Sequence, residues 1–158
     1  MKNGNFMKLT LKTKSSIETQ NIAKLIAPLL IPGDVITLTG DLGAGKTTFV
    51  KGIAKCLKIE EDIISPTFNI LKCYFQSKPH LYHIDAYRLE NIHQELGLEE
   101  FIEGDGICVI EWPVFIDYLI PKDHLEVSIV NKGDNNREIT FIGFGNHYDN
   151  IIEQIKKA

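Results

Sequence analysis

The fold of this chain can be worked out from the sequence GDLGAGKT at residues 40–47. These residues match the phosphate-binding loop G-x-x-x-x-G-K-[ST] at every fixed position. The β-branched run Val35–Thr39 before the loop is typical of a buried strand, and Lys46–Leu57 after it has helical periodicity. Because the motif requires a strand before it and a helix after it, the sequence predicts a nucleotide-binding loop between the two.

The residue types in the loop explain how it would hold phosphate. Glycines let backbone N–H groups turn inward and approach an anion closely, and the following helix presents the positive end of its dipole. Lys46 is expected to reach the β- and γ-phosphates, and the hydroxyl of Thr47 is expected to ligate Mg²⁺. A glycine-rich turn that binds nothing is the alternative.

Two acidic residues follow apolar strand patterns further along the chain. Glu111 comes directly after Ile107–Ile110, and Asp85 comes directly after Leu81–Ile84. A nucleotide-bound Mg²⁺ keeps several waters and takes only one or two protein carboxylates. We therefore expect at least one of these acids to serve the metal, although a helix N-cap or a surface position remains the alternative for each.

The sequence NKGD at residues 131–134 matches the guanine-reading motif N-K-x-D of GTPases. A GTPase would also carry D-x-x-G after a strand, and no such glycine follows Asp85. The segments on either side, Leu125–Val130 and Arg137–Phe144, both have strand patterns. A hairpin turn is therefore the better interpretation of this motif.

The remaining apolar patterns predict further elements. Strands are expected at Met7–Lys12, Phe68–Phe75 and Leu81–Ile84, and helices at Ile17–Leu29, Leu89–Ile102 and Asn146–Lys157. The acidic residues between positions 90 and 105 are expected to form a solvated face.

Composition limits the class of protein. The 158 residues predict a single domain, 1–158, and 17 basic against 21 acidic residues give a formal net charge of −4. This balance argues against broad binding of DNA or RNA, which depends on Lys and Arg displacing counterions.

The chain shows no secretory or membrane signal, so a cytoplasmic location is expected. Its N-terminus is polar, and its longest apolar stretch, Leu25–Ile31, is far below the roughly 20 residues that span a membrane. The chain has three cysteines, an odd number, and no C-x-x-C pair, which argues against a disulfide framework or a zinc site. We therefore expect Cys56, Cys73 and Cys108 to be buried, reduced and hydrophobic in role.

Four motifs in order resemble one family. They are GDLGAGKTT at residues 40–48, SPTF at 65–68, HIDAYRL at 83–89 and IEWP at 110–113. Together they look like the bacterial TsaE (YjeE) ATPases, and the resemblance runs from about Ile17 to Phe144. The combination is specific, whereas the phosphate-binding loop alone would be generic.

The resemblance implies a fold and a function. Family members are small ATPases with an α/β, P-loop NTPase-like fold of three layers around a mixed sheet. They use ATP and Mg²⁺ and are needed to form the threonylcarbamoyl group on the adenosine next to the anticodon of tRNAs that read ANN codons. They act with the TsaB and TsaD proteins, so this chain would meet tRNA through those partners.

The resemblance also implies roles for individual residues. Those expected to hold the phosphates are Gly43, Ala44, Gly45, Lys46, Thr47 and Thr48. Thr47, Asp85 and Glu111 would lie at the metal, and Glu111 would also orient the attacking water. Thr67, in a switch-like segment over the γ-phosphate, would offer its hydroxyl, and Arg137 would contact the nucleotide.

Some positions near these motifs have structural alternatives or depart from the family. His83 is expected to be a strand core residue, and Trp112 a partly buried core aromatic. Ala86 stands where Leu is more usual, and Val114-Phe115 follows IEWP where many relatives carry Glu or Gln. These departures affect the rim of the site rather than its phosphate chemistry.

Arginine content bears on the mechanism. Arg88 and Arg137 are the two arginines of the chain, and neither is an obvious arginine finger. We therefore expect ATP hydrolysis to be slow in the isolated chain and faster with partners. A small-molecule P-loop kinase is the alternative enzyme, although such enzymes usually close an arginine-rich lid, and a nucleotide-sensing adaptor is the non-catalytic alternative.

Overall fold

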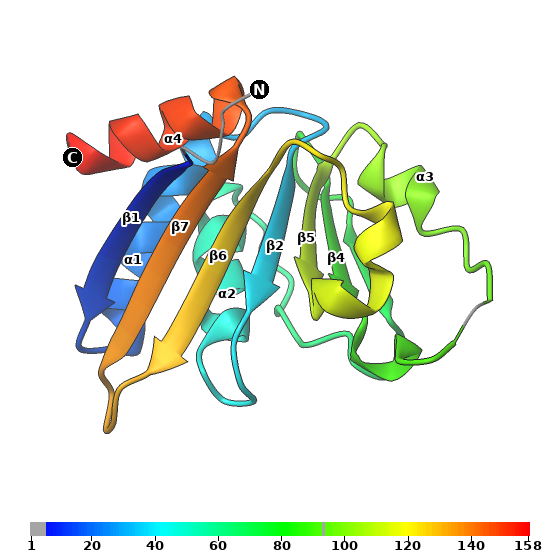
Figure 1. Ribbon diagram of the computed structural model, residues 1–158, viewed down its shortest axis with the longest axis horizontal. Helices are drawn as coiled ribbons and strands as arrows, with labels where there is room; N and C mark the ends of the chain where they lie inside the picture. Colours follow the sequence, from blue (N-terminus) through cyan, green and yellow to red (C-terminus); the bar gives the residue numbers. More distant parts are fainter. Residues whose placement is uncertain (1–5, 93) are drawn as a thin grey trace.

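A computed structural model describes residues 6–92 and 94–158 of the chain, and its centre is a mixed β-sheet (Figure 1). The strands are β1 (Met7–Thr13), β2 (Val35–Thr39), β3 (Leu71–Tyr74), β4 (Leu81–Asp85), β5 (Ile107–Glu111), β6 (His124–Asn131) and β7 (Arg137–Phe144). They lie in the order β1-β7-β6-β2-β5-β4-β3. The α/β class with a mixed sheet is therefore confirmed.

Helical elements lie between most of these strands, although β4 follows β3 and β7 follows β6 directly. The α-helices are α1 (Ser16–Ile26), α2 (Lys46–Cys56), α3 (Glu99–Ile102) and α4 (Asn146–Lys156), and the 3₁₀ segments are η1 (Ala27–Leu29), η2 (Tyr87–Leu89) and η3 (Pro113–Leu119). Ser15 caps α1, because its Oγ accepts a hydrogen bond from the backbone N–H of Glu18 at 3.1 Å.

The strands in the middle of the sheet run parallel. Strand β2 pairs in parallel with both β5 and β6, and β4 pairs in parallel with β5, whereas β1, β3 and β7 pair antiparallel. Parallel strands are covered on both faces, which explains why the apolar run Val35–Leu38 is buried throughout. Their carboxyl ends share one edge of the sheet.

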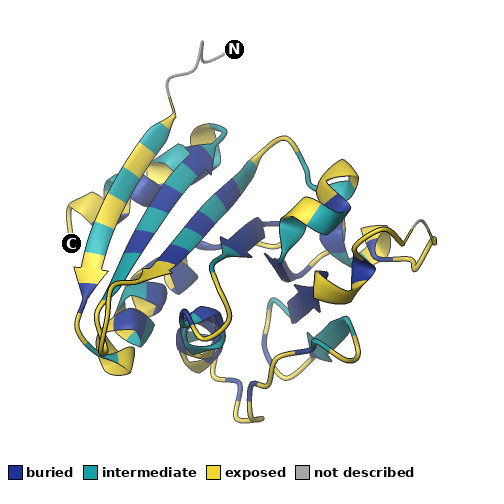
Figure 2. Ribbon diagram, turned by 60° about the horizontal axis from the view of Figure 1, so that its bottom comes forward, coloured by how far each residue is buried: buried dark blue, intermediate teal, exposed yellow. Residues whose placement is uncertain are grey.

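Helices cover the two faces of the sheet unequally. Helices α1, α2 and α4 pack on one face and form a large core with side chains such as Phe49 and Phe141. On the other face, η2, α3 and η3 pack over β4 and β5 around Ile84 and Ile110. The three-layer arrangement is thus confirmed for the half of the sheet that contains β4 and β5. Buried and more exposed residues alternate along β6 and β7, whose outer face lacks a helical cover in the described residues (Figure 2).

Two predicted elements are wrong in extent. Among its described residues, the expected helix Leu89–Ile102 is helical only at η2 and at Glu99–Ile102, because Asn91 and Gly97 adopt left-handed φ angles of 61° and 73° that interrupt it. The expected strand Phe68–Phe75 is shortened to β3, since residues 66–69 form a turn and Ile70 has a φ of 68°.

The hairpin interpretation of residues 131–134 is confirmed. Strands β6 and β7 pair antiparallel with Asn131 opposite Arg137. The side-chain oxygen of Asn131 accepts a hydrogen bond from the backbone N–H of Gly133 at 2.9 Å, as in a turn stabilised by asparagine. The C-terminal helix is also confirmed, within one residue, as α4.

The cysteines are free, and their burial differs. Cys108 is buried in β5, and this burial raises the pKa of its thiol. Cys56 and Cys73 are only partly buried, so the expectation that all three would be core residues is wrong for these two.

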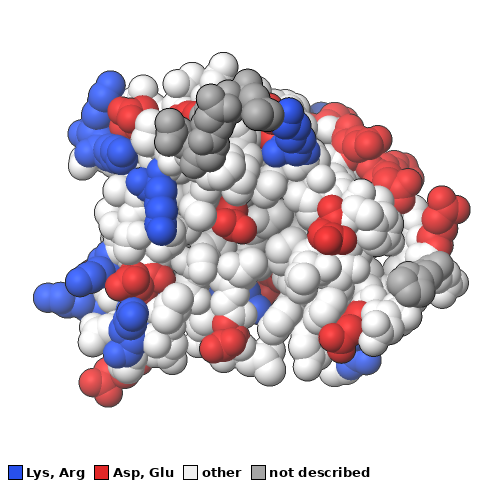
Figure 3. All heavy atoms as spheres, viewed as in Figure 1, with Lys and Arg blue, Asp and Glu red and all other residues white. Residues whose placement is uncertain are grey.

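Charge is distributed unevenly over the surface (Figure 3). Acidic side chains gather at the end of the molecule near α3, and basic side chains gather at the opposite end. The acidic residues between positions 90 and 105 are exposed, which confirms the solvated face. No helix in the part of the chain that the structure describes is both long and apolar enough to cross a membrane.

The close approach of α1 and α2 leads to a prediction about stability. A Cβ atom at Gly52 would lie 2.6 Å from the backbone oxygen of Gln20 and 2.7 Å from Cβ of Ala23. Gly52→Ala should therefore lower the free energy of unfolding by about 1–2 kcal/mol, because overpacking outweighs the better helix propensity of alanine. Urea denaturation measures this change. The exposed neighbour Lys51→Ala is the control, and equal effects of the two substitutions would contradict the prediction.

Candidate functional site

The loop at residues 40–45 leaves the carboxyl end of β2 and leads into α2. Gly43 and Gly45 have left-handed φ angles of 78° and 114°, which L side chains rarely adopt. At Gly40 an added Cβ would lie 2.6 Å from the backbone oxygen of Ile129 on β6. Gly45 is the N-cap of α2, and no described side chain caps the helix there. The first backbone N–H groups of α2 therefore accept no help from a capping side chain and are free to bind another acceptor.

A cavity of about 520 Å³ opens over this loop. Its lining residues come from separate segments of the chain and are Leu42, Gly43, Gly45, Lys46, Thr47, Thr48, Ser65, Thr67, Asp85, Tyr87, Glu111 and Trp112. The fold therefore brings together the predicted phosphate-binding residues, both predicted acids and Thr67. Ala44, also in the loop, is buried and does not line the cavity.

Lys46 is a buried cation at the base of the cavity. Its side-chain Nζ donates to the backbone oxygen of Gly40 at 2.8 Å and lies 3.8 Å from Glu111 Oε1. The same Nζ lies 4.4 Å from the ring centroid of Trp112. These contacts compensate the burial of the ammonium group, and a phosphate placed over the loop would compete for it.

Asp85 is held by the segment that precedes β3. Its Oδ2 accepts hydrogen bonds from Thr67 Oγ1 at 2.8 Å and from Ser65 Oγ at 3.3 Å. Its Oδ1 accepts from the backbone N–H of Tyr87 at 2.9 Å. The switch-like segment is therefore tied to Asp85 at the end of β4.

Glu111 ends β5, directly beside Asp85 in the parallel register of the sheet. Its Oε2 lies 2.6 Å from Nε2 of His83, a side chain with no exposed surface. His83 is a strand core residue as predicted, but its contact with Glu111 is not evident in the motif. The alternation along β4 is the signal that could have suggested it, because His83 and Asp85 are two residues apart and so share one face.

The residue after Glu111 has unusual backbone geometry. Trp112 adopts a left-handed φ of 57°, which is an outlier for a bulky side chain. Its ring lies 5.0 Å from that of Tyr87 and 6.1 Å from that of Phe115, measured between centroids. Trp112 is thus a partly buried aromatic as predicted, and it also forms a wall of the cavity.

Arg137 supports the loop through a hydrogen bond to its backbone. Its Nε donates to the backbone oxygen of Ala44 at 2.8 Å. Its Nη1 donates to Asn131 Oδ1 and to the backbone oxygens of Asp134 and Asn136, at 2.9–3.2 Å. Arg137 does not line the 520 Å³ cavity, so its direct contact with a nucleotide stays a prediction.

The residues in the cavity fit a nucleotide with Mg²⁺. Gly43 has open space where a Cβ would stand, and Lys46 supplies a cation beside it. The hydroxyl of Thr47 and the carboxylates of Asp85 and Glu111 are hard oxygen donors on the cavity wall, the ligand type that Mg²⁺ prefers.

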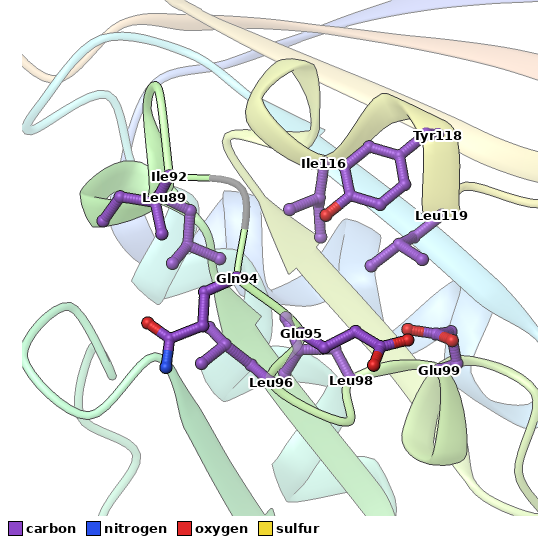
Figure 4. A pocket seen from close by; sticks show the side chains of 10 residues that line it. All are labelled: Leu89, Ile92, Gln94, Glu95, Leu96, Leu98, Glu99, Ile116, Tyr118 and Leu119. Carbon is purple, nitrogen blue, oxygen red and sulfur yellow. The ribbon is translucent and has the colours of Figure 1, made fainter.

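A second hollow, of about 430 Å³, lies between η3 and the segment that leads to α3 (Figure 4). Leu89, Leu98 and Ile116 contribute apolar surface to it, and Glu95 and Glu99 supply its acidic groups. It contains none of the predicted site residues and is therefore separate from the 520 Å³ cavity.

Comparisons with known proteins agree on one family. The family model described as "Threonylcarbamoyl adenosine biosynthesis protein TsaE" matches residues 13–139. The chain is 46% identical over 146 residues to the tRNA threonylcarbamoyladenosine biosynthesis protein TsaE of Bacillus subtilis (strain 168), which covers 92% of each chain. It is 40% identical over 130 residues to the protein of the same name from Treponema pallidum (strain Nichols), with 81% of this chain and 96% of that protein covered.

The fold is similar to a solved structure. A crystal structure of Bacillus subtilis YdiB superposes with a TM-score of 0.85 at 40% sequence identity, and the match covers 98% of both chains. The similarity therefore includes the whole sheet and the loop that follows β2.

The position of Trp112 allows a direct binding measurement. It is the only tryptophan of the chain, and its ring lies against Lys46 Nζ. A nucleoside triphosphate with Mg²⁺ should draw Lys46 toward the phosphates and change the tryptophan emission in a saturable titration. Lys46→Ala should weaken this binding at least about tenfold, because one charge-assisted contact contributes about 1.5–3 kcal/mol. Unchanged affinity in Lys46→Ala would contradict the site, and Lys51→Ala serves as the control.

Proposed function

The chain belongs to the TsaE family of threonylcarbamoyl adenosine biosynthesis proteins, and we propose that its part in this pathway is Mg²⁺-dependent ATP hydrolysis. It would act with the TsaB–TsaD pair to form the threonylcarbamoyl group on the adenosine next to the anticodon of tRNAs that read ANN codons. The observation that carries the proposal is the single cavity in which a phosphate-binding loop with its buried Lys46 faces two carboxylates, Asp85 and Glu111.

The loop would bind ATP through its backbone and Lys46. The N–H groups of residues 43–48 lie at the start of α2, where the helix dipole favours a negative charge. Thr47, Asp85 and Glu111 would hold Mg²⁺, which when bound neutralises charge on the β- and γ-phosphates.

The acidic residues would then position the reacting groups. Phosphoryl transfer depends on placement and charge neutralisation more than on covalent chemistry. Glu111 lies on the cavity wall beside Lys46, where its carboxylate would orient the attacking water. Thr67 Oγ1 donates to Asp85 Oδ2 at 2.8 Å and both residues line the cavity, so the switch-like segment lies beside the carboxylate that would hold the metal.

Partners would supply a cationic group for the transition state, which neither arginine of this chain is placed to provide. The guanidinium of Arg88 lies 4.3 Å from the ring centroid of Phe68, and Arg137 is bonded to Ala44 and the hairpin. Both arginines are thus occupied outside the described cavity lining. The net charge of −4 also favours contact with tRNA through the TsaB–TsaD pair rather than directly, and the pathway would place the chain in the cytoplasm.

Glu111→Gln separates binding from hydrolysis. The substitution keeps the shape of the side chain but removes its negative charge. ATP affinity, measured by Trp112 emission, should stay within about threefold, whereas turnover should fall about 100-fold or more because a positioned acid–base group contributes about 10²–10⁴-fold. Glu99→Gln on exposed α3 is the matched control. Turnover that survives in Glu111→Gln would remove Glu111 from the mechanism.

Phosphate release measured with and without the TsaB–TsaD pair tests the proposed function. The isolated chain should hydrolyse ATP slowly, and the pair should accelerate it at least about tenfold, because a missing transition-state cation is worth about 10³–10⁵ in related enzymes. Rapid turnover that partners leave unchanged would contradict the partner dependence. Transfer of phosphate to nucleosides or small alcohols would instead support the kinase alternative, and no phosphate release with TsaB, TsaD and tRNA present would support the adaptor.

A further inference from the structure

We infer that His83 is a positioning residue for Glu111. Its Nε2–H donates to Glu111 Oε2, which leaves Glu111 Oε1 as the oxygen that would face the metal and the attacking water. The inference rests on the proposed function of Glu111. It assigns a role in hydrolysis to a side chain that does not touch the cavity, since His83 is absent from the cavity lining and has no exposed surface.

The geometry of the pair is that of a strong hydrogen bond. The Nε2–Oε2 distance is 2.6 Å, and the two side chains are 0% and 4% exposed. Hydrogen bonds to ionised groups are shorter than neutral ones, and low local dielectric strengthens them. His83 lies on β4 and Glu111 on β5, and these strands pair in parallel. Both side chains therefore project from hydrogen-bonded strands of the sheet.

The other ring nitrogen indicates which tautomer is present. Nδ1 of His83 is buried, and no described group forms a hydrogen bond with it. If Nδ1 carried the proton, a buried N–H donor would lack an acceptor, and Nε2 would face the carboxylate with a lone pair. A proton on Nε2 avoids both penalties, so His83 donates to Glu111.

The consequence is that the two oxygens of Glu111 are not equivalent. Oε2 is occupied by His83, whereas Oε1 faces Lys46 at 3.8 Å. Without His83 the carboxylate could turn about its last bond, because Lys46 alone does not fix both oxygens. Asp85 is restrained comparably by Thr67 and the N–H of Tyr87, so each acid of the site has its own orienting partner.

Two substitutions distinguish positioning from a simple core role. The amide of Gln in His83→Gln reaches about as far as Nε2 and can still donate to Glu111, whereas the shorter amide in His83→Asn cannot. In steady-state hydrolysis with the TsaB–TsaD pair, His83→Asn should lower kcat about 10–100-fold with KM within about threefold, as for partners that orient metal-site ligands. His83→Gln should recover kcat to within about threefold of the wild type.

A third comparison tests whether His83 acts through Glu111. In the Glu111→Gln background, His83→Asn should cause no further loss of kcat, because effects of residues that act as a unit are not additive. Equal losses in His83→Gln and His83→Asn, or an unchanged kcat in a folded His83→Asn, would overturn the inference. If His83→Asn does not fold, the comparison of His83→Gln with the wild type decides, and a loss of tenfold or more there would overturn it.

A spectroscopic readout makes the result independent of turnover. In the protein labelled with ¹⁵N-histidine, the ring signals of His83 are identified by their loss in His83→Gln. Protonation at Nε2 with an unprotonated Nδ1 is the expected result, and a proton on Nδ1 alone would overturn the inference. An inactive wild type would count against the proposed ATPase function, whereas an active wild type with the wrong tautomer would count against the role of His83 alone.

Discussion

The parallel pairing of β2, β5 and β4 is the constraint on which the site depends. Parallel neighbours end at the same edge of a sheet, and here Leu38 lies opposite Glu111, which lies opposite Asp85. Three segments that are far apart in the sequence therefore bring the loop that carries the phosphate-binding motif and two carboxylates to one place. The apolar residues of these strands are buried on both sides, so the packing that stabilises the sheet also determines how the acids are spaced.

Local sequence patterns predict the elements whose own residues decide their structure. The strand before the loop, α2, the hairpin and α4 all follow from periodicity and turn chemistry. The predicted helix at Leu89–Ile102 does not form in full, because the left-handed residues Asn91 and Gly97 redirect the backbone over the edge of the sheet. Leu89, Leu98 and Ile102 are instead buried by packing on β4 and β5, a long-range effect that local spacing does not encode, whereas Ile92 and Leu96 stay exposed.

The site also contains residues that the sequence identifies and contacts that only the folded structure reveals. Lys46, Asp85 and Glu111 can be identified from the sequence because each sits at a fixed place relative to a strand end. The bond between His83 and Glu111, and the contact of Lys46 with Trp112, depend on strand order and side-chain rotamers. For Arg137, the strand that it begins is visible in the sequence, but its hydrogen bond to Ala44 arises only because β7 pairs with β6 and β6 pairs with β2.

The order of the strands also affects how the protein matures on the ribosome. The GDLGAGKT motif is synthesised early, whereas the two strands that flank β2 come from residues 107–111 and 124–131. Ile129 on β6 packs against Gly40, and Arg137, which holds Ala44, follows later still. A nascent chain therefore carries the motif through most of its synthesis without the strands that shape it, so the loop can take its folded shape only near the end of translation.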